Sequence, residues 1–257
     1  MSEHEKYLKK IKKHKFFILG MQILIFILFI FIWQYLASKG LINTFITSSP
    51  KKILKTLINL YNSNSLFKHV FITIYEVFIS FSLGTILGLL IATLLWWNKS
   101  LAEILDPYLT ILNSLPKIAL GPIIIIWVGA KMRSIIIMAL LISLIVAIIN
   151  IYEGFMNTDT LKINMLKSFK ASKLQIFFKL ILPNSIKNII NVIKVNISMS
   201  LIGVIMGEFL VSKDGIGYLI TYGSQVFNLD LVMTGILLLC IIATIMYYLI
   251  NLIAKKY

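Results

Sequence analysis

Six long apolar stretches dominate the chain, and polar segments separate them. About 20 consecutive apolar residues are enough for a helix to cross the hydrocarbon core of a bilayer. The pattern therefore predicts an all-α membrane protein, with a short basic arm at 1–15 and one transmembrane domain at 16–257. The six predicted spans cover residues 16–37, 67–97, 101–128, 134–153, 186–211 and 229–253.

The first stretch follows a lysine-rich start and ends near Leu36, Ala37 and Ser38, which are features that a signal peptide shares. Its apolar run is longer than the roughly 7–15 residues of a signal peptide. We therefore expect a retained transmembrane helix, with a signal peptide as the alternative.

The third stretch is interrupted by Pro107, Pro116 and Pro122. Broken helix at membrane depth is tolerated only where it faces protein or a water-filled cavity. We therefore expect this stretch to line a translocation path. For Lys117 in this stretch, the alternative is that the side chain reaches the membrane edge or a carbonyl group. The candidate lining residues are Asn113, Ser114 and Lys117.

The fifth stretch carries a polar stripe formed by Lys187, Asn191, Lys194 and Ser198. Their spacing places all four on one side of a helix. Such a stripe faces water, a partner or a pore rather than lipid. We expect Asn191, Lys194 and Ser198 to line the same path.

Glycine pairs predict close helix contacts and a tight turn. Small residues four apart let a neighbouring helix approach closely, and the pair that follows the fifth span suits a tight turn. The pairs are Gly84 and Gly88, Gly203 and Gly207, and Gly215 and Gly217.

Two carboxylates, Glu76 and Glu208, lie inside predicted spans. An ionisable residue within a membrane is a candidate functional residue. For Glu76 the alternative is a pairing with a lysine near the membrane interface.

Residues 159–185 lie in the longest segment between two predicted spans, 154–185, and their pattern predicts two short amphipathic helices. Apolar residues recur at every fourth position from Leu161 to Phe169. A capping box at Ser172 starts the second helix, and Pro183 is expected to end it. Two amphipathic helices outside the membrane indicate an element that docks on a partner.

The composition excludes an ordinary soluble domain, because 59% of the 257 residues are hydrophobic, the mean hydropathy is +0.91 and only 14% are charged. The net charge of +15 fits the positive-inside rule better than nucleic-acid binding. Of the 25 Lys and Arg residues, 15 fall in segments expected inside and 8 in segments expected outside. Both termini and residues 159–185 are therefore expected in the cytoplasm.

The sequence shows no constellation that predicts catalysis. The lone Cys240 allows neither a disulfide nor a cysteine metal site, and no phosphate-binding loop of the G-x-x-x-x-G-K-[ST] type is present. We expect a transport subunit without cofactor or metal, with ATP handled by another protein. A stand-alone channel or an ion-driven carrier is the alternative.

Residues 159–185 also resemble the cytoplasmic EAA loop of bacterial ABC-importer permeases. The resemblance rests on Ala171-Ser172 followed by Leu180-Ile-Leu-Pro183. The Glu-Ala-Ala positions are occupied by residues 164–166, Asn-Met-Leu, and Lys170 occupies the position of the usual glycine. That position requires a left-handed backbone conformation. A lysine there is therefore expected to lower the stability of the turn by roughly 1–2 kcal/mol.

Two further regions extend the resemblance to about residues 45–250. Leu115-Pro116-Lys117 is similar to the sulfonate, nitrate, taurine and thiamine-precursor branch of these permeases, and the run from Gly207-Glu208 to Gly217-Tyr218 is similar to the pattern of the family. The resemblance implies a type I (MetI-like) permease of six transmembrane helices in the bacterial cytoplasmic membrane, which translocates a small solute.

The partners that the resemblance implies are two ABC ATPase subunits, an extracytoplasmic substrate-binding protein and a second permease copy, with the homodimer favoured. Lipid surrounds the spans, and no nucleic acid is expected. The residues expected to couple to the ATPase are Met165, Leu166, Phe169, Lys170, Ala171, Ser172 and Pro183.

Overall fold

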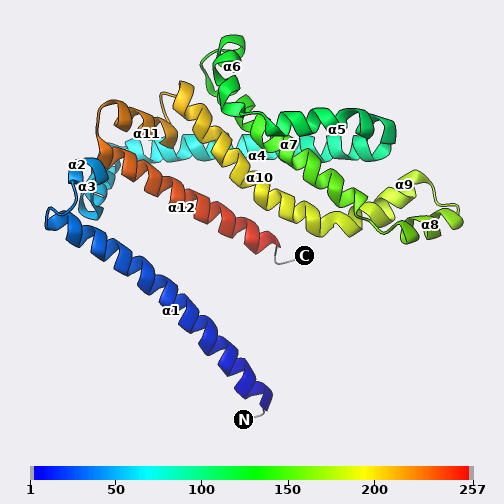
Figure 1. The fold of residues 1–257 in the computed structure, drawn as a ribbon, viewed down its shortest axis with the longest axis horizontal. Helices are drawn as coiled ribbons and strands as arrows, with labels where there is room; N and C mark the ends of the chain where they lie inside the picture. Colours follow the sequence, from blue (N-terminus) through cyan, green and yellow to red (C-terminus); the bar gives the residue numbers. More distant parts are fainter. Residues whose placement is uncertain (1–2, 255–257) are drawn as a thin grey trace.

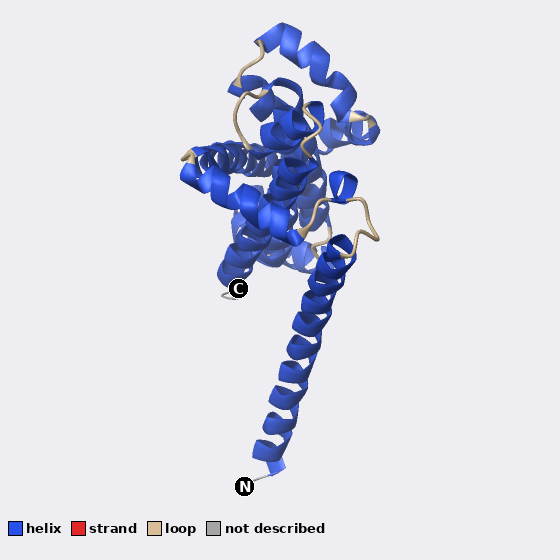
Figure 2. Cartoon of the chain, turned by 90° about the vertical axis from the view of Figure 1, so that its left-hand side faces the viewer, coloured by secondary structure: helices blue, strands red, loops and turns tan. Residues whose placement is uncertain are grey.

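The computed structural model describes residues 3–254, and this part of the chain is helical without strands (Figures 1 and 2). The structure does not describe the side chains of residues 3–6, 8, 9, 253 and 254. The elements are α1 (Glu3–Ser38), α2 (Thr44–Thr47), α3 (Pro50–Asn62), α4 (Ser65–Trp97), α5 (Lys99–Ser114), η1 (Lys117–Leu120), α6 (Gly121–Val128), α7 (Met132–Met156), α8 (Thr160–Ser168), α9 (Lys173–Ile176), the π-helical turn η2 (Phe177–Ile181), α10 (Leu182–Val211), α11 (Ile216–Gln225) and α12 (Leu229–Ala254).

Five of these helical stretches are long and apolar enough to cross a membrane singly. The third predicted span is instead a bent pair, in which Lys99–Ser114 and Lys117–Val128 meet at 89°. The bend lies at Pro116, and Pro122 starts α6. The expectation that Pro107 also interrupts the span is wrong, because α5 continues through it. The six predicted spans are therefore all present as helices, one of them broken.

The centre of the fold is formed by α4, α7 and α10, which pack along most of their lengths (Figure 1). Glycine allows the closest approaches. A Cβ at Gly203 would lie 2.5 Å from the Cα of Ala139, and one at Gly88 would lie 2.7 Å from the Cβ of Ala147. Glycine on α4 and α10 therefore lets both helices lie directly against α7.

The remaining helices surround this centre unequally. α12 packs against α11 and α3, whereas α1 projects away from the body and touches it through α3 near its own C-terminal end (Figures 1 and 2). The basic arm, as far as residues 3–15 are described, is the first part of α1. No residue is buried in the window of α1 that could span a membrane, so its apolar surface is available to lipid or to another chain.

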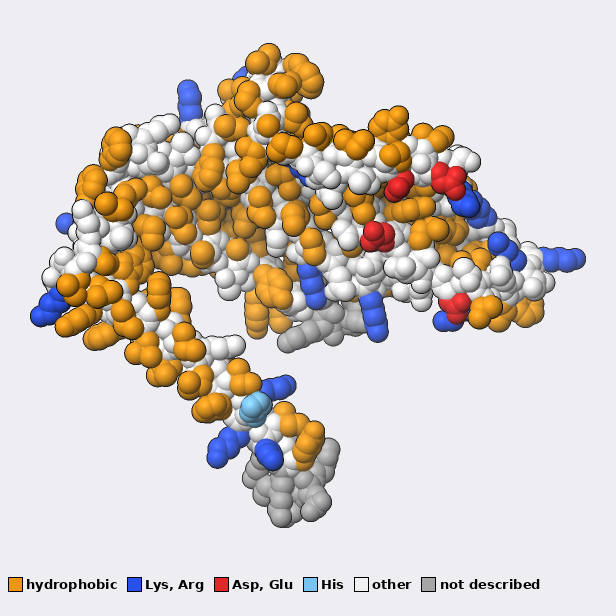
Figure 3. Space-filling model, in the orientation of Figure 1, with side chains coloured by type: hydrophobic (Ala, Val, Ile, Leu, Met, Phe, Trp, Pro, Cys, Tyr) orange, Lys and Arg blue, Asp and Glu red, His pale blue; other side chains and the backbone are white. Residues whose placement is uncertain are grey.

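The two ends of the molecule differ in what they carry. α2, α3 and α11 lie at one end, and α8 and α9 lie at the other (Figure 1). Charged side chains on the visible face gather around α8 and α9, while apolar side chains cover much of its middle (Figure 3). The body is thus an apolar helical layer with a polar, basic end.

The expectation that Pro183 ends the second amphipathic helix is wrong, because helix continues from α9 through η2 into α10. The π-helical turn explains the continuity. The N–H of Leu182 bonds to the carbonyl of Phe177, five residues back. Proline lacks an N–H and its ring crowds the preceding turn, and the wider turn accommodates it. Pro183 therefore lies in the first turn of α10.

Candidate functional site

Helix α8 has one face against the body and one face open. Ile163 and Leu166 pack on a core cluster that includes Phe155 and Ile176. On the open side, the side chains of Leu161 and Phe169 are 76% and 75% exposed. We call the open apolar side chains of this region the coupling face. Its members are Leu161, Met165, Phe169, Leu174 and Phe178.

The turn between α8 and α9 is a Schellman motif with lysine at its left-handed position. Lys170 has a φ of 57°. Its N–H bonds to the carbonyl of Lys167, and the N–H of Ala171 bonds to the carbonyl of Leu166. These two bonds define the motif, in which glycine is the usual left-handed residue. The backbone conformation that the sequence predicted for Lys170 is therefore present.

The start of α9 carries the predicted capping box. The N–H of Gln175 donates to the hydroxyl of Ser172, and the N–H of Ser172 donates to the side chain of Gln175. The neighbouring Lys173 donates its ammonium group to the carbonyl of Trp97 at the end of α4. The Schellman turn, the capping box and this contact hold α8 and α9 in a fixed orientation against the membrane domain.

The structure places each predicted coupling residue in this region, but not all of them on the open side. Met165, Phe169, Lys170 and Ser172 are exposed. Leu166 and Ala171 are half-buried and pack towards the core cluster. Pro183 lies beyond the π-helical turn. The coupling face thus includes Leu161, Leu174 and Phe178, which the sequence-based list omits.

The predicted lining residues of the third span lie at the bend. Asn113 and Ser114 are exposed at the end of α5, and Lys117 is half-buried at the start of η1. The Lys117 ammonium group donates to the carbonyl of Asn113 over 2.7 Å. That carbonyl is one of those that a helix end leaves without a partner. Lys117 therefore supplies a hydrogen-bond donor to the end of α5.

The predicted stripe on α10 lies on its open side. Lys187, Asn191 and Ser198 are exposed and Lys194 is half-buried. The opposite side of α10 is also polar, but there Asn196 and Ser200 are buried against the other central helices. Within the described part of the chain, no hydrogen bond or ion pair joins the α10 stripe to the polar residues at the α5 bend.

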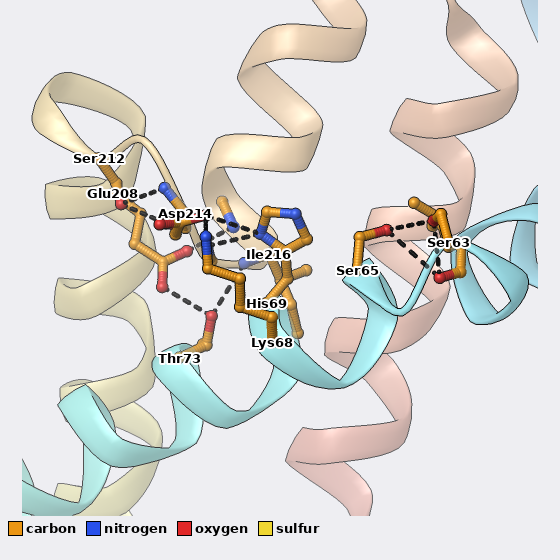
Figure 4. Close-up of polar contacts among 12 residues, drawn as sticks. Ser63, Ser65, Lys68, His69, Thr73, Glu208, Ser212, Asp214 and Ile216 are labelled. Carbon is orange, nitrogen blue, oxygen red and sulfur yellow. Dashed lines mark hydrogen bonds and ion pairs between the residues drawn. The ribbon is translucent and has the colours of Figure 1, made fainter.

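A buried polar cluster at the other end of the molecule pins α11 to the core (Figure 4). The Thr73 hydroxyl on α4 donates to Oε1 of Glu208 on α10 over 2.6 Å and accepts from the N–H of Ile216 over 2.9 Å. The other Glu208 oxygen accepts from the N–H of Gly217. One carboxylate therefore joins α4, α10 and the first turn of α11.

His69 and Lys68 extend this cluster to the loop before α11. His69 accepts a hydrogen bond at Nδ1 from the N–H of Gly215 over 2.9 Å, and Lys68 forms an ion pair with Asp214 over 2.7 Å (Figure 4). Gly215 has a φ of 107°, which requires glycine.

Gly217, the second glycine after the fifth span, is not a turn residue. Gly217 lies inside α11, and a Cβ there would meet the Glu208 side chain at 2.7 Å. Glycine is needed at this position because any side chain would collide with Glu208.

Sequence reasoning singled out Glu208 but missed Thr73 and His69. Their spacing on α4 put both on one helix face, but nothing in the sequence placed the loop before α11 against that face.

Glu76 is buried on α4 beside Glu208. Among the described side chains it forms no ion pair with a lysine. The alternative considered for Glu76, a pairing with a lysine, is therefore not what accommodates this carboxyl group.

A family described as binding-protein-dependent transport system inner membrane component matches residues 84–257. The chain belongs to this family. The protein is accordingly the permease subunit of an ABC importer and a multi-pass protein of the bacterial inner membrane.

Curated relatives cover most of the permease. A probable ABC transporter permease protein of Haemophilus influenzae is 28% identical over 226 residues, which are 88% of this chain and 91% of the relative. A putative aliphatic sulfonates transport permease protein of Bacillus subtilis is 28% identical and covers 88% and 82%. A formylaminopyrimidine transport permease protein of Halalkalibacterium halodurans is 26% identical and covers 76% and 77%.

Solved structures share the fold of the permease. A chain of the inward-facing MetNI methionine ABC transporter matches with a TM-score of 0.65 at 18% identity, covering 73% of this chain and 94% of that one. A bacterial ABC transporter that imports alginate matches with a TM-score of 0.66 at 14% identity, covering 98% and 99%. These matches support the type I importer architecture.

Proposed function

We propose that a separate ATPase binds the coupling face of this permease and drives solute import through it. The exposed apolar side chains of the coupling face carry this proposal. Phe169 extends from a turn that two backbone hydrogen bonds hold rigid, and it lies at the basic end of the molecule. A rigid, exposed apolar surface outside the spans suits a protein partner that buries it.

The continuous helix from α9 to α10 supports a mechanical role for this region. Helix runs from Lys173 to Val211, and only the π-helical turn interrupts its α-helical geometry. Movement of α9 with a bound ATPase would therefore pass directly to α10 and its polar stripe. Alternating access then follows from the different affinities of the ATPase and the solute for the two states.

For the solute, we propose a small organic anion of the sulfonate class. One relative at 28% identity is a putative aliphatic sulfonates permease, and another relative is a taurine permease. Lys194 lies half-buried on the α10 stripe, where a cation would attract an anionic group. The path in this proposal comprises Asn113, Ser114 and Lys117 at the bend and Asn191, Lys194 and Ser198 on α10.

For the assembly, we propose two permease copies, two ATPase subunits and an extracytoplasmic binding protein, with both permease termini in the cytoplasm. The family description supports the binding protein. The apolar surface of α1 that its own chain leaves open could contact lipid or a second permease copy.

The experiment that tests coupling compares Phe169→Asp with Ser168→Asp. Both place one negative charge on exposed side chains at the end of α8, but only the first removes a member of the coupling face. Burial of a phenylalanine contributes about 1.5–3 kcal/mol. Association of the purified ATPase with Phe169→Asp should therefore fall at least about tenfold, and sulfonate uptake into proteoliposomes should fall with it.

Equal association of the ATPase with Phe169→Asp and with the unaltered permease would contradict the assigned docking surface. A permease that supports uptake with no ATPase present would instead favour the carrier alternative. Circular dichroism and gel filtration of both variants show whether the membrane domain remains folded.

A further inference from the structure

A second surface lies behind α8, on the side opposite to the coupling face. It is a cavity of about 490 Å³ between α8, α9 and the ends of α4 and α7. Most of its wall is apolar or aromatic, and Trp96, Tyr152, Phe155, Ile163 and Ile176 contribute to it. The cavity therefore lies between part of α8 and the ends of α4 and α7, beside the packing of Leu166 on the core cluster.

Three lysines, Lys99, Lys167 and Lys173, also line this cavity. Lys173 is held in place, because its ammonium group donates to the Trp97 carbonyl and lies 5.5 Å from the centre of the Trp96 ring. Lys99 pairs with Glu103 at 3.5 Å, but both side chains are largely exposed, and such surface pairs contribute little. Lys167 and Lys173 pair with no carboxylate among the described residues.

The cavity also borders the end of the α4 span, where lipid headgroups are expected. Trp96 and Trp97 end the α4 span, and tryptophan side chains gather at the boundary between hydrocarbon and headgroups. The lysines follow just beyond them along the chain. The lysine distribution of the whole sequence predicts that this end faces the cytoplasmic leaflet, which is rich in anionic lipid.

We propose that this cavity binds an anionic phospholipid. The phosphate lies against Lys99, Lys167 and Lys173, and an acyl chain lies along the aromatic wall. A free phosphate ion would satisfy the lysines but would leave the apolar wall exposed to water. A zwitterionic phospholipid would cover the wall, but its own cation would offset the attraction to the lysines.

Bound lipid would fill the space between α8 and the ends of α4 and α7. It would thereby add to the contacts that hold α8 and α9 in their orientation relative to the spans. This inference concerns binding to the permease alone, so its test does not depend on the proposed ATPase or solute.

The test uses tryptophan fluorescence, because Trp96 lines this cavity and the ring of its neighbour Trp97 lies 5.7 Å from the Lys173 ammonium group. Trp33→Phe and Trp127→Phe remove the other two. The full chain is reconstituted in phosphatidylcholine vesicles that contain a small, equal fraction of brominated phosphatidylglycerol or brominated phosphatidylcholine. Bromine quenches tryptophan on contact, so the brominated phosphatidylglycerol should quench more strongly.

Charge variants show whether the lysines cause the preference. A lysine near anionic lipid contributes about 1 kcal/mol to the free energy of binding. Lys173→Gln should therefore lower the preference for phosphatidylglycerol about fivefold. Lys173→Arg should retain the preference. The triple change of Lys99, Lys167 and Lys173 to Gln should abolish it. Its matched control changes three lysines at the other end of the molecule to Gln, namely Lys51, Lys55 and Lys213.

Equal quenching by the two brominated lipids, or an unchanged preference in the triple variant, would overturn the proposal. Loss of the preference in the matched control would also overturn it, because general surface charge would then explain binding. Reversal by millimolar inorganic phosphate would identify the ligand as a free anion instead. Reversal by added ATPase at fixed lipid would assign the cavity to the protein partner.

Discussion

The hydroxyl of Thr73 joins two distant parts of the chain, because it donates to Glu208 and accepts from the N–H of Ile216. All three groups are buried. Thr73→Val keeps the shape of the side chain but leaves a carboxylate and an N–H without this partner. The free energy of unfolding should fall by about 1–3 kcal/mol, measured as thermal unfolding of the purified protein.

Thr73→Ser is the control for this change, since it keeps the hydroxyl and removes only a methyl group. It should unfold close to the unaltered protein. If the valine and serine variants lose the same stability, packing rather than hydrogen bonding at this position holds α11.

Close contact between α7 and α10 predicts that Gly203→Ala is destabilising. The added Cβ would meet the backbone of Ala139 at 2.5 Å, and backbone cannot move aside as a flexible side chain can. Overpacking of this kind costs about 1–3 kcal/mol. Thermal unfolding in detergent measures the loss.

Gly20→Ala provides the comparison for the glycine prediction. Gly20 lies on α1 with nothing within 4 Å of an added Cβ, and alanine favours helix. The free energy of unfolding of this variant should be unchanged or slightly higher. A Gly203→Ala protein as stable as Gly20→Ala would show that the two helices separate easily.

The left-handed Lys170 predicts that Lys170→Gly stabilises the turn between α8 and α9. Removing the side chain relieves about 1–2 kcal/mol of backbone strain at φ 57°. Hydrogen exchange of the amides in residues 160–171 should slow by roughly tenfold, and association with the ATPase should be preserved or strengthened. Loss of association would instead show that the lysine side chain contacts the ATPase.

Lys167→Gly is a suitable contrast for the same measurement. It removes a lysine from the last turn of α8, where the backbone is helical, and glycine there costs about 1 kcal/mol. Hydrogen exchange should accelerate in this variant. Slower exchange in both would mean that loss of charge, rather than backbone conformation, stabilises the turn.

Local patterns predicted much of this structure. The hydrophobic runs match five helices long enough to cross a membrane and one bent helix pair, and the serine and glutamine spacing at Ser172 identified the capping box. The motif position of Lys170 anticipated its left-handed backbone. These features depend on residues a few positions apart, where sequence spacing and spatial distance agree.

The errors concern features that depend on helix geometry or tertiary contact. A proline inside a helix can bend it, end it or be accommodated, and Pro107 and Pro183 are both accommodated. The contact of Thr73 with Glu208 spans 135 residues. Its partners became identifiable only once α4, α10 and α11 were placed together.

The π-helical turn also sets the rotational phase of α10. One extra residue in a helical turn rotates everything that follows by about 100° about the axis. The turn at 177–181 therefore determines that Asn196 and Ser200 face the central helices while Asn191 and Ser198 stay open. Deleting one residue within it would turn α10 by about 100°, which would move Ser198 to the buried position of Ile197 and Asn196 to the exposed position of Val195.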